Sequence, residues 1–225
     1  MTSIDATTLF SLSGKVALVT GGSRGIGRMV AEGFVRSGAR VYITSRKAEA
    51  CERTAAELSS LGPCHAISTD ITNSEGRKLL VHKLQTREDS LDILVNNVGG
   101  VISSEGIIGT SMENFRDTFD INLFGGFELM KLTIPHMRKQ QWGRIINIAS
   151  IGGREYGGNI SYMSAKAALI GATKHAAREL AKDGVLVNSL APGIIAHEGG
   201  NWGRFQQDNP PEVVASFIEQ NLPMG

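Results

Sequence analysis

The sequence lacks most features of secreted, membrane-spanning or nucleic-acid-binding proteins. It has only two cysteines in 225 residues, Cys51 and Cys64, and they form no paired motif, so we expect reduced thiols. The formal net charge of +1 gives no reason to expect nucleic acid or an anionic membrane as a partner. No apolar run approaches the length of a membrane span, and residues 1–14 lack the basic start of a signal peptide. We therefore expect a cytoplasmic protein.

Metal-binding patterns are also missing. The five histidines show no ligand spacing, and His136 and His175 lie in helical patterns, so we predict no metal site. What the chain does contain is 41% hydrophobic residues and 27 glycines, a composition typical of a soluble, turn-rich α/β protein. Its length is expected for a single domain, residues 1–225, with a sizeable core.

Short apolar runs alternate with amphipathic stretches along the chain. The runs have continuous apolar character, which predicts parallel strands buried on both faces. Because strands and helices alternate, we expect right-handed crossovers and a Rossmann-type doubly wound parallel sheet flanked by helices. The expected strands cover residues 16–20, 41–44, 65–69, 93–95, 145–149 and 186–190, and the expected helices cover about 25–37, 47–60, 74–88, 113–139 and 161–182.

A glycine-rich turn, Thr20-Gly-Gly-Ser-Arg-Gly-Ile-Gly27, follows the first strand and opens the first helix. Gly21 permits the tight turn, Gly25 permits approach of a pyrophosphate, and Gly27 permits close packing of the helix on the sheet. An ordinary glycine-rich turn is the alternative, but the position at the first strand–helix junction favours a dinucleotide. The candidate cofactor-binding residues in this turn are Gly21, Ser23, Arg24, Gly25, Ile26 and Gly27.

The end of the second strand favours NADP(H) over NAD(H). Enzymes that prefer NAD usually have an acidic residue there to bind the ribose hydroxyls. This chain has Thr44-Ser45-Arg46-Lys47 and no carboxylate before Glu49. Arg46 and Arg24 could hold a 2′-phosphate through charge-assisted hydrogen bonds, although both could also be solvated surface arginines.

Three residues suggest proton transfer to or from a substrate oxygen. Ser150 ends the fifth strand, and twelve residues later comes Tyr162-Met-Ser-Ala-Lys166. Tyr162 and Lys166 are one helical turn apart and share a face. Free tyrosine has a pKa of about 10, and a neighbouring ammonium together with a charged nicotinamide ring would lower it. Ser150 would hydrogen-bond the carbonyl oxygen, although Tyr-x-x-x-Lys alone is more often a surface pair.

Together these motifs resemble the short-chain dehydrogenase/reductase family, and more specifically its 3-oxoacyl-thioester reductases. The resemblance runs from about residue 12 to residue 193 and is highly specific, because the motifs occur in one fixed order. Further matches are Asp70 after the third expected strand, Asn96-Asn97-Val98-Gly99 after the fourth, Asn122 in the long helix and Pro192-Gly193 after the sixth.

The resemblance implies further contacts with the cofactor. Asp70 and Ile71 would border the adenine, Asn97 would lie along the cofactor, and Ile195 would contact its carboxamide end. Asp70 has a plainer possible role as a helix N-cap.

The resemblance also implies roles for two catalytic residues besides Ser150 and Tyr162. Lys166 would bind the nicotinamide ribose, and Asn122 would hold a water that links Lys166 to solvent in a proton relay. Asn122 could equally be a buried side chain that satisfies backbone groups.

The end of the chain is expected to cover the substrate. Residues 194–225 would form a lid, in which Trp202, Phe205 and Phe217 offer an apolar wall or simply pack a small helical cap. By resemblance, the docking arginines of bacterial carrier-protein reductases correspond here to Gln141 and Asp183. A free or CoA-linked keto compound, or a secondary alcohol, is therefore as plausible a substrate as a carrier-bound one.

Family members normally continue past the position of Gly225 with one more helix and strand, so the C-terminus looks truncated and the last sheet edge would be bare. The resemblance also implies a homo-oligomer. Its interface would be the small-residue face of the 161–182 helix, with Ala165, Ala168, Ala172 and Ala176, together with the 113–139 helix. The alternative is that these alanines pack on the sheet.

Two functions of different classes fit the sequence. The first is an enzyme that interconverts a small-molecule ketone and a secondary alcohol with NADP(H). The second is a non-catalytic NADP-binding sensor or interaction module, which would need only the glycine turn.

Overall fold

The computed structural model describes residues 6–102, 105–155, 158–197 and 199–222. The chain divides into two compact units, Met1–Pro192 and Gly193–Gly225. In the part of the chain that the structure describes, no helix is both long enough and apolar enough to cross a membrane.

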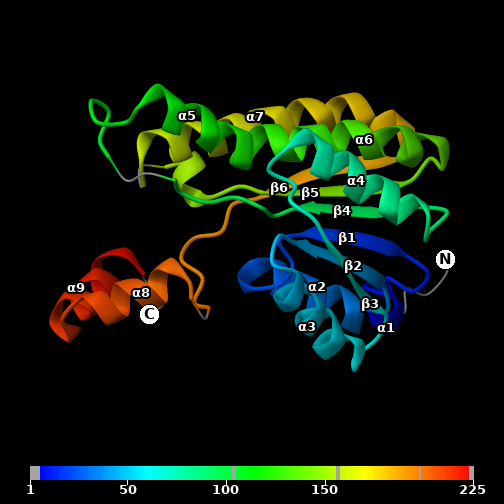
Figure 1. Ribbon diagram of the computed structural model, residues 1–225, viewed down its shortest axis with the longest axis horizontal. Helices are drawn as coiled ribbons and strands as arrows, with labels where there is room; N and C mark the ends of the chain where they lie inside the picture. Colours follow the sequence, from blue (N-terminus) through cyan, green and yellow to red (C-terminus); the bar gives the residue numbers. More distant parts are fainter. Residues whose placement is uncertain (1–5, 103–104, 156–157, 198, 223–225) are drawn as a thin grey trace. The chain divides into compact units, whose positions relative to one another are not determined.

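The first unit is built on a six-stranded parallel sheet with the order β3-β2-β1-β4-β5-β6 (Figure 1). The predicted doubly wound fold is therefore confirmed. Each predicted strand is present, with bounds that differ by at most two residues. The strands are β1 Val16–Thr20, β2 Arg40–Ser45, β3 Cys64–Ser68, β4 Ile93–Asn96, β5 Gly143–Ile148 and β6 Val185–Leu190.

Helices cover both faces of this sheet (Figure 1). Helices α2 and α3 pack on one face and α4, α6 and α7 on the other, which gives the unit two hydrophobic clusters. The helical segments of the unit are α1 Ala6–Leu9, α2 Gly25–Arg36, α3 Ala48–Ser59, α4 Ser74–Gln85, α5 Met112–Phe119, η1 Asp120–Phe124, α6 Gly125–Lys139, η2 Ile151–Gly153, α7 Ile160–Leu180 and η3 Ala181–Asp183.

Strand β1 shows why its first four residues are apolar. Val16 and Leu18 belong to the cluster under α4, α6 and α7, whereas Ala17 and Val19 belong to the cluster under α2 and α3. All four are buried, because successive side chains of a strand point to opposite faces. A continuous apolar run therefore predicts a strand covered on both sides.

The predicted helix at 113–139 is interrupted by a single π turn. Helix α5 ends at Phe119, η1 follows as a π-helix over Asp120–Phe124, and α6 continues to Lys139. Asn122 lies in the π turn and hydrogen-bonds the backbone of Gly100, outside the helix. Such turns are common at functional sites, and hydrophobic periodicity alone does not predict them.

The second unit is a pair of short helices, α8 Asn201–Asp208 and α9 Pro211–Asn221. Three aromatic rings hold them together: Trp202, Phe205 and Phe217 lie with their ring centroids 5.0–5.7 Å apart. Of the two roles considered for these aromatics, the structure supports packing within a small helical cap.

The alanines predicted for a subunit interface are partly used inside the fold. Ala165 is fully buried, and Ala176 packs against the core, while Ala168 and Ala172 are half-buried. The α7 face is therefore only in part available to another helix.

Candidate active site

The carboxyl ends of β1 and β4 lie side by side where the strand order reverses. From β1 the chain proceeds outward to β2 and β3, and from β4 it proceeds in the opposite direction to β5 and β6. Open α/β sheets bind ligands in the crevice at such a switch point. The glycine turn follows β1 and the Asn97 segment follows β4, so both predicted motifs meet there.

The glycine turn has the backbone that its sequence predicts. Gly21 and Gly25 have φ angles of +65° and +54°, in the left-handed region that favours glycine. A Cβ on Gly27 would collide with the Gly21 carbonyl oxygen and lie 2.6 Å from Asn97 Nδ2. Helix α2 begins at Gly25, and its N-cap residue Arg24 makes no side-chain capping bond. The first N–H groups of α2 are thus left without a side-chain cap, as an anion site requires.

Asn97 and Thr20 fix the turn against β4. The Asn97 side-chain amide donates to the Thr20 carbonyl oxygen at 2.8 Å and to that of Gly21 at 3.4 Å. The Thr20 hydroxyl accepts from the backbone N–H groups of Asn97 and Val98 at 2.9 and 3.1 Å. The structure therefore gives Asn97 a role in holding the turn, besides the cofactor contact that the resemblance implies.

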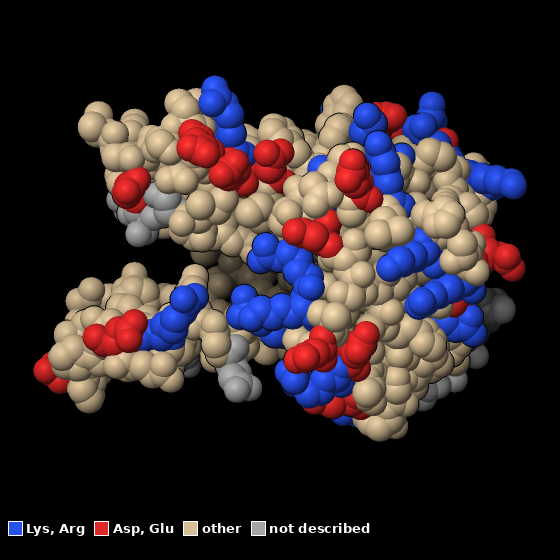
Figure 2. All heavy atoms as spheres, in the orientation of Figure 1, with Lys and Arg blue, Asp and Glu red and all other residues tan. Residues whose placement is uncertain are grey.

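Two exposed arginines lie near the crevice, as the sequence predicts. Arg24 precedes α2, and Arg46 follows β2, where no carboxylate occurs before Glu49. The pKa of Asp70 is lowered by the Thr72 backbone N–H, and further by the Thr72 hydroxyl and the Arg46 charge. In Figure 2, basic side chains gather over the region of α2 and α3, and acidic ones are interspersed among them.

Asp70 is not the helix N-cap that was considered for it. Its carboxylate accepts from the Thr72 backbone at 3.0 Å and from the Thr72 hydroxyl at 2.8 Å, which closes a local turn. The N-cap of α4 is Asn73, whose side chain accepts from the Gly76 N–H at 2.8 Å. The cap lies three residues further along because the Asp70–Thr72 turn comes before the helix.

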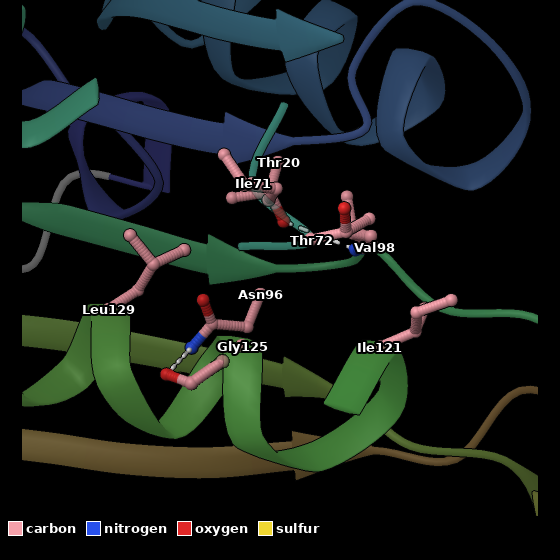
Figure 3. Close-up of a pocket in the computed structure, with 9 residues that line it drawn as sticks. Thr20, Ile71, Thr72, Asn96, Val98, Ile121, Gly125 and Leu129 are labelled. Atoms are coloured by element: carbon pink, nitrogen blue, oxygen red, sulfur yellow. Dashed lines mark hydrogen bonds between the residues drawn. The ribbon is translucent and has the colours of Figure 1, made fainter. Parts of the chain in front are cut away.

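A small cavity of about 10 Å³ lies inside the switch point (Figure 3). Asn96 donates to the Gly126 carbonyl oxygen at 3.3 Å and to Asn147 Oδ1 at 2.9 Å. Its own buried Oδ1 has no hydrogen-bond partner among the described residues. A mostly apolar lining therefore surrounds the unpaired oxygen of Asn96, next to Ile71 of the predicted adenine border. The lining residues are Thr20, Ile71, Thr72, Asn96, Val98, Ile121, Gly125, Gly126 and Leu129.

Ser150 lies two residues after the end of β5 and is the N-cap of the short helix η2. Its hydroxyl accepts from the Gly152 N–H at 3.2 Å, and the side chain is half-buried. Helix η2 packs closely against α7: a Cβ on Gly153 would lie only 2.8 Å from the Lys166 carbonyl carbon. The structure therefore brings the segment of Ser150 against the helix of Tyr162 and Lys166, although no hydrogen bond between the Ser150 and Tyr162 hydroxyls occurs within the described residues.

Tyr162 and Lys166 share one face of α7, as their spacing predicts. Lys166 Nζ lies 5.7 Å from the centroid of the Tyr162 ring and donates to the Ile148 carbonyl oxygen at 2.8 Å. The lysine side chain is only 3% exposed. This burial lowers the pKa of Lys166 to about 8, because a buried ammonium loses its hydration.

Asn122 lies beside Lys166. The Asn122 amide donates to the carbonyl oxygens of Gly100 and Thr118 at 2.8 and 2.9 Å, and its Oδ1 accepts from the Gly100 N–H at 3.0 Å. A Cβ on Gly99 would lie 2.6 Å from Asn122 Oδ1 and 2.9 Å from Lys166 Nζ. The two polar atoms therefore flank one point at Gly99. Asn122 satisfies backbone groups, the plainer role considered for it, and it does so next to Lys166.

Ile195 is the predicted cofactor-binding residue nearest the C-terminus. It belongs to the second unit and is 40% exposed. Its contact with the cofactor stays a prediction, as does the lid role of residues 194–225.

Sequence reasoning missed two residues at the site. The glycine-turn motif assigns no role to Thr20, although the Thr20 hydroxyl joins β1 to the segment after β4. Asn159 was not singled out, although an Asn three residues before Tyr162 is a recognisable helix-start signal. Within the described ranges, no group of three or more His, Cys, Asp or Glu side chains could hold a metal ion.

Comparison with known proteins identifies the family of the chain. The sequence pattern of the family described as short chain dehydrogenase matches residues 15–204. The chain is 39% identical over 192 residues to a Pseudomonas aeruginosa 3-oxoacyl-acyl-carrier-protein reductase of rhamnolipid biosynthesis, which covers 82% of this chain and 74% of the relative. It is 38% identical over 218 residues to a sorbitol dehydrogenase of Cereibacter sphaeroides, which covers 95% of this chain and 80% of the relative.

A solved structure is similar as well. The Pseudomonas aeruginosa RhlG/NADP active-site complex superposes with a TM-score of 0.84 and 35% identity, covering 92% of this chain and 82% of that one. The match over most of the chain, at this level of identity, carries the classification. The chain belongs to the short-chain dehydrogenase family and is an oxidoreductase related to 3-oxoacyl reductases.

Proposed function

We propose that the chain uses NADP(H) to interconvert a ketone and a secondary alcohol, with Tyr162 as the general acid and base. The observation that carries the proposal is that the four candidate catalytic residues lie on neighbouring segments around one buried lysine. Lys166 is buried between Asn122 and the Ser150 segment, and Tyr162 lies one turn before it on the same helix. A protein that only senses NADP(H) has no need of a buried amine beside a tyrosine and an asparagine.

The residues present fit a dinucleotide. The uncapped N–H groups at the start of α2 suit a pyrophosphate, and the lack of a side chain at Gly27 lets α2 pack closely against the turn at Gly21. Ser23 and Ile26 belong to the same turn and complete the proposed cofactor-binding residues. When bound, NADPH supplies the hydride that reduces the carbonyl carbon.

The chain's own residues supply the proton chemistry. In the reduction direction, the Tyr162 hydroxyl donates its proton to the carbonyl oxygen, and the Ser150 hydroxyl hydrogen-bonds that oxygen and holds it in place. Lys166 then returns a proton to the Tyr162 oxygen, for which a pKa of about 8 is well matched near neutral pH. Asn122, bonded to Gly100 and next to Lys166, positions the path by which Lys166 regains its proton.

Arg24 and Arg46 are proposed to select NADP(H) by pairing with its 2′-phosphate. Replacing both with serine should weaken NADPH binding by about a hundredfold or more, because each charge-assisted hydrogen bond contributes about 1.5–3 kcal/mol. NADH binding should change little, because NADH lacks the phosphate. Fluorescence titration with each cofactor measures both dissociation constants.

The matched control for this pair is Arg28→Ser. Arg28 is also an exposed arginine near the turn, but it is paired with Glu57 at 3.0 Å. It should leave the NADPH/NADH ratio unchanged. Equal affinity of the wild-type protein for both cofactors would contradict the proposed selection.

For the substrate, we propose a keto compound that is free or linked to CoA, such as a 3-oxoacyl thioester. At one of the two positions that correspond to docking arginines, Asp183 accepts from Arg138 Nε at 2.6 Å, and Arg138 also pairs with Glu179. A basic side chain at this surface is therefore already neutralised, which disfavours docking of an acidic carrier protein.

We also propose that the chain forms a homo-oligomer in the cytoplasm. Phe124 and Phe127 are half-exposed apolar residues on the α5–α6 face and would contribute to its interface.

A further inference from the structure

Helix α7, which carries Tyr162 and Lys166, begins at a buried asparagine. The Asn159 Oδ1 atom accepts from the Tyr162 backbone N–H at 2.8 Å and from the Ser161 hydroxyl at 3.3 Å. Asn159 is therefore the N-cap of α7, and its capping bond ends on the tyrosine itself. The position of the Tyr162 backbone depends directly on this one side chain.

The Asn159 side chain differs from an ordinary surface cap. The residue is only 9% exposed, and its Nδ2 atom is buried with no partner within the described residues. A cap chosen for stability alone would avoid this cost, because an unpaired buried amide group is unfavourable. Aspartate also caps helices well and interacts more favourably with the helix dipole. What asparagine provides and aspartate does not is a cap without charge.

We infer that Asn159 is a positioning residue for Tyr162, an uncharged cap that fixes the tyrosine backbone without placing a negative charge at the start of its helix. The inference rests on the proposed role of Tyr162 in proton transfer. A carboxylate at this position would oppose formation of the phenolate, whereas the neutral amide does not.

The charged groups near α7 can be named from the elements that pack against it. The Lys166 ammonium lies 5.7 Å from the centroid of the Tyr162 ring, and its positive charge favours the phenolate. Strand β6, which packs on α7, carries no charged residue, and η3 carries Lys182 and the paired Asp183. The remaining charged side chains on or next to elements packed against α7 are exposed: Arg154, Glu155, Glu113, Arg116, Asp117 and Asp120.

The test compares Asn159→Asp, Asn159→Ser and Asn159→Ala. Asn159→Asp should keep the fold and NADPH binding but move the pH of half-maximal alcohol oxidation upward by about one unit. Asn159→Ala, which loses the cap, should lower kcat about tenfold or more with little change in KM. Asn159→Ser restores a neutral cap and should recover most of the turnover with the wild-type pH profile.

The matched control is Asn73, which caps α4 by the same bond to a backbone N–H at 2.8 Å but is exposed and lies on another helix. Asn73→Asp makes the same chemical change away from Tyr162 and should leave the pH profile in place. Asn73→Ala should lower the stability of the fold. Its kcat should fall by no more than a few tenths of the wild-type value.

A second readout needs no turnover. The protein has three tyrosines, so the phenolate absorbance of each variant minus that of the same variant carrying Tyr162→Phe isolates the titration of Tyr162. Asn159→Asp should move this titration upward by about one pH unit. If no ketone were reduced but this shift occurred, the proposed function would fail and the positioning role would stand. An unmoved Tyr162 titration in Asn159→Asp, or full kcat in Asn159→Ala, would overturn the inference.

Discussion

Replacing Tyr162 with phenylalanine is expected to lower kcat by about a hundredfold to ten-thousandfold, the usual contribution of a positioned acid–base group. Phenylalanine keeps the ring that lies 5.7 Å from Lys166 Nζ and loses only the hydroxyl. The NADPH dissociation constant should therefore change little. Steady-state kinetics and a fluorescence titration on the same preparation separate the two effects.

Tyr42→Phe is the control for this change. The Tyr42 hydroxyl donates to Glu88 at 2.6 Å, and the side chain is buried on β2, away from the proposed chemistry. This variant should lose stability, because Glu88 loses a partner, but it should keep its turnover. If Tyr162→Phe retained the turnover of the wild-type protein, the proposed mechanism would be wrong.

Replacing Lys166 with methionine is expected to change stability in a pH-dependent way as well as abolish turnover. Burial lowers the pKa of Lys166 from 10.5 to about 8. Below pH 8 both folded and unfolded chains carry the proton, and the folded state carries the full cost of the buried charge. Between about pH 8 and pH 10.5 the unfolded chain binds the proton that the folded chain has released, so the free energy of unfolding rises with pH.

The size of this effect is on the order of 3 kcal/mol across that window. Lys166→Met has no amine to titrate, so it should be the more stable protein at pH 7, by that amount less the lost bond to the Ile148 carbonyl. Its advantage should shrink as the pH rises. Denaturant unfolding of both proteins at several pH values measures the difference directly.

Other buried groups cancel in this comparison. The pKa of Tyr42 is raised to about 12 and that of Cys64 to about 11, chiefly by burial, so both oppose the Lys166 effect at high pH. They are present in both proteins and drop out of the difference. Lys174→Met removes an exposed lysine of the same helix and is the matched control for the substitution. A stability difference that is constant with pH would contradict the buried-amine account of Lys166.

The sheet could be predicted from the sequence because its strands are apolar on both faces. Val16–Thr20 is a clear case, with alternate residues in two separate cores. The glycine turn after β1 and the Asn97 segment after β4 can likewise be placed at one edge of the sheet from sequence order, since parallel strands end at the same edge. These are properties of local pattern and of sheet topology, and both can be inferred from sequence order.

The missed features depend on side-chain contacts that the pattern of residue types does not define. The π turn at Asn122 depends on its bonds to Gly100, twenty-two residues earlier in the chain. Asn73 caps α4 instead of Asp70 because the Asp70 carboxylate is engaged with Thr72. Trp202, Phe205 and Phe217 can be identified as apolar from the sequence, but only coordinates show that they pack on one another. Asn159 could have been found from its spacing to Tyr162, but its burial could not.

The most direct test of the central claim is hydride transfer itself. The purified chain would be incubated with NADPH carrying deuterium on the transferable position of the nicotinamide and with a panel of ketones that includes 3-oxoacyl-CoA thioesters. Mass spectrometry of the products then shows whether deuterium has reached the carbinol carbon. We predict that at least one ketone gives a deuterated alcohol, and that Tyr162→Phe forms it far more slowly. Tight NADPH binding with no deuterium transfer to any ketone would contradict the account and favour a non-catalytic NADP-binding sensor.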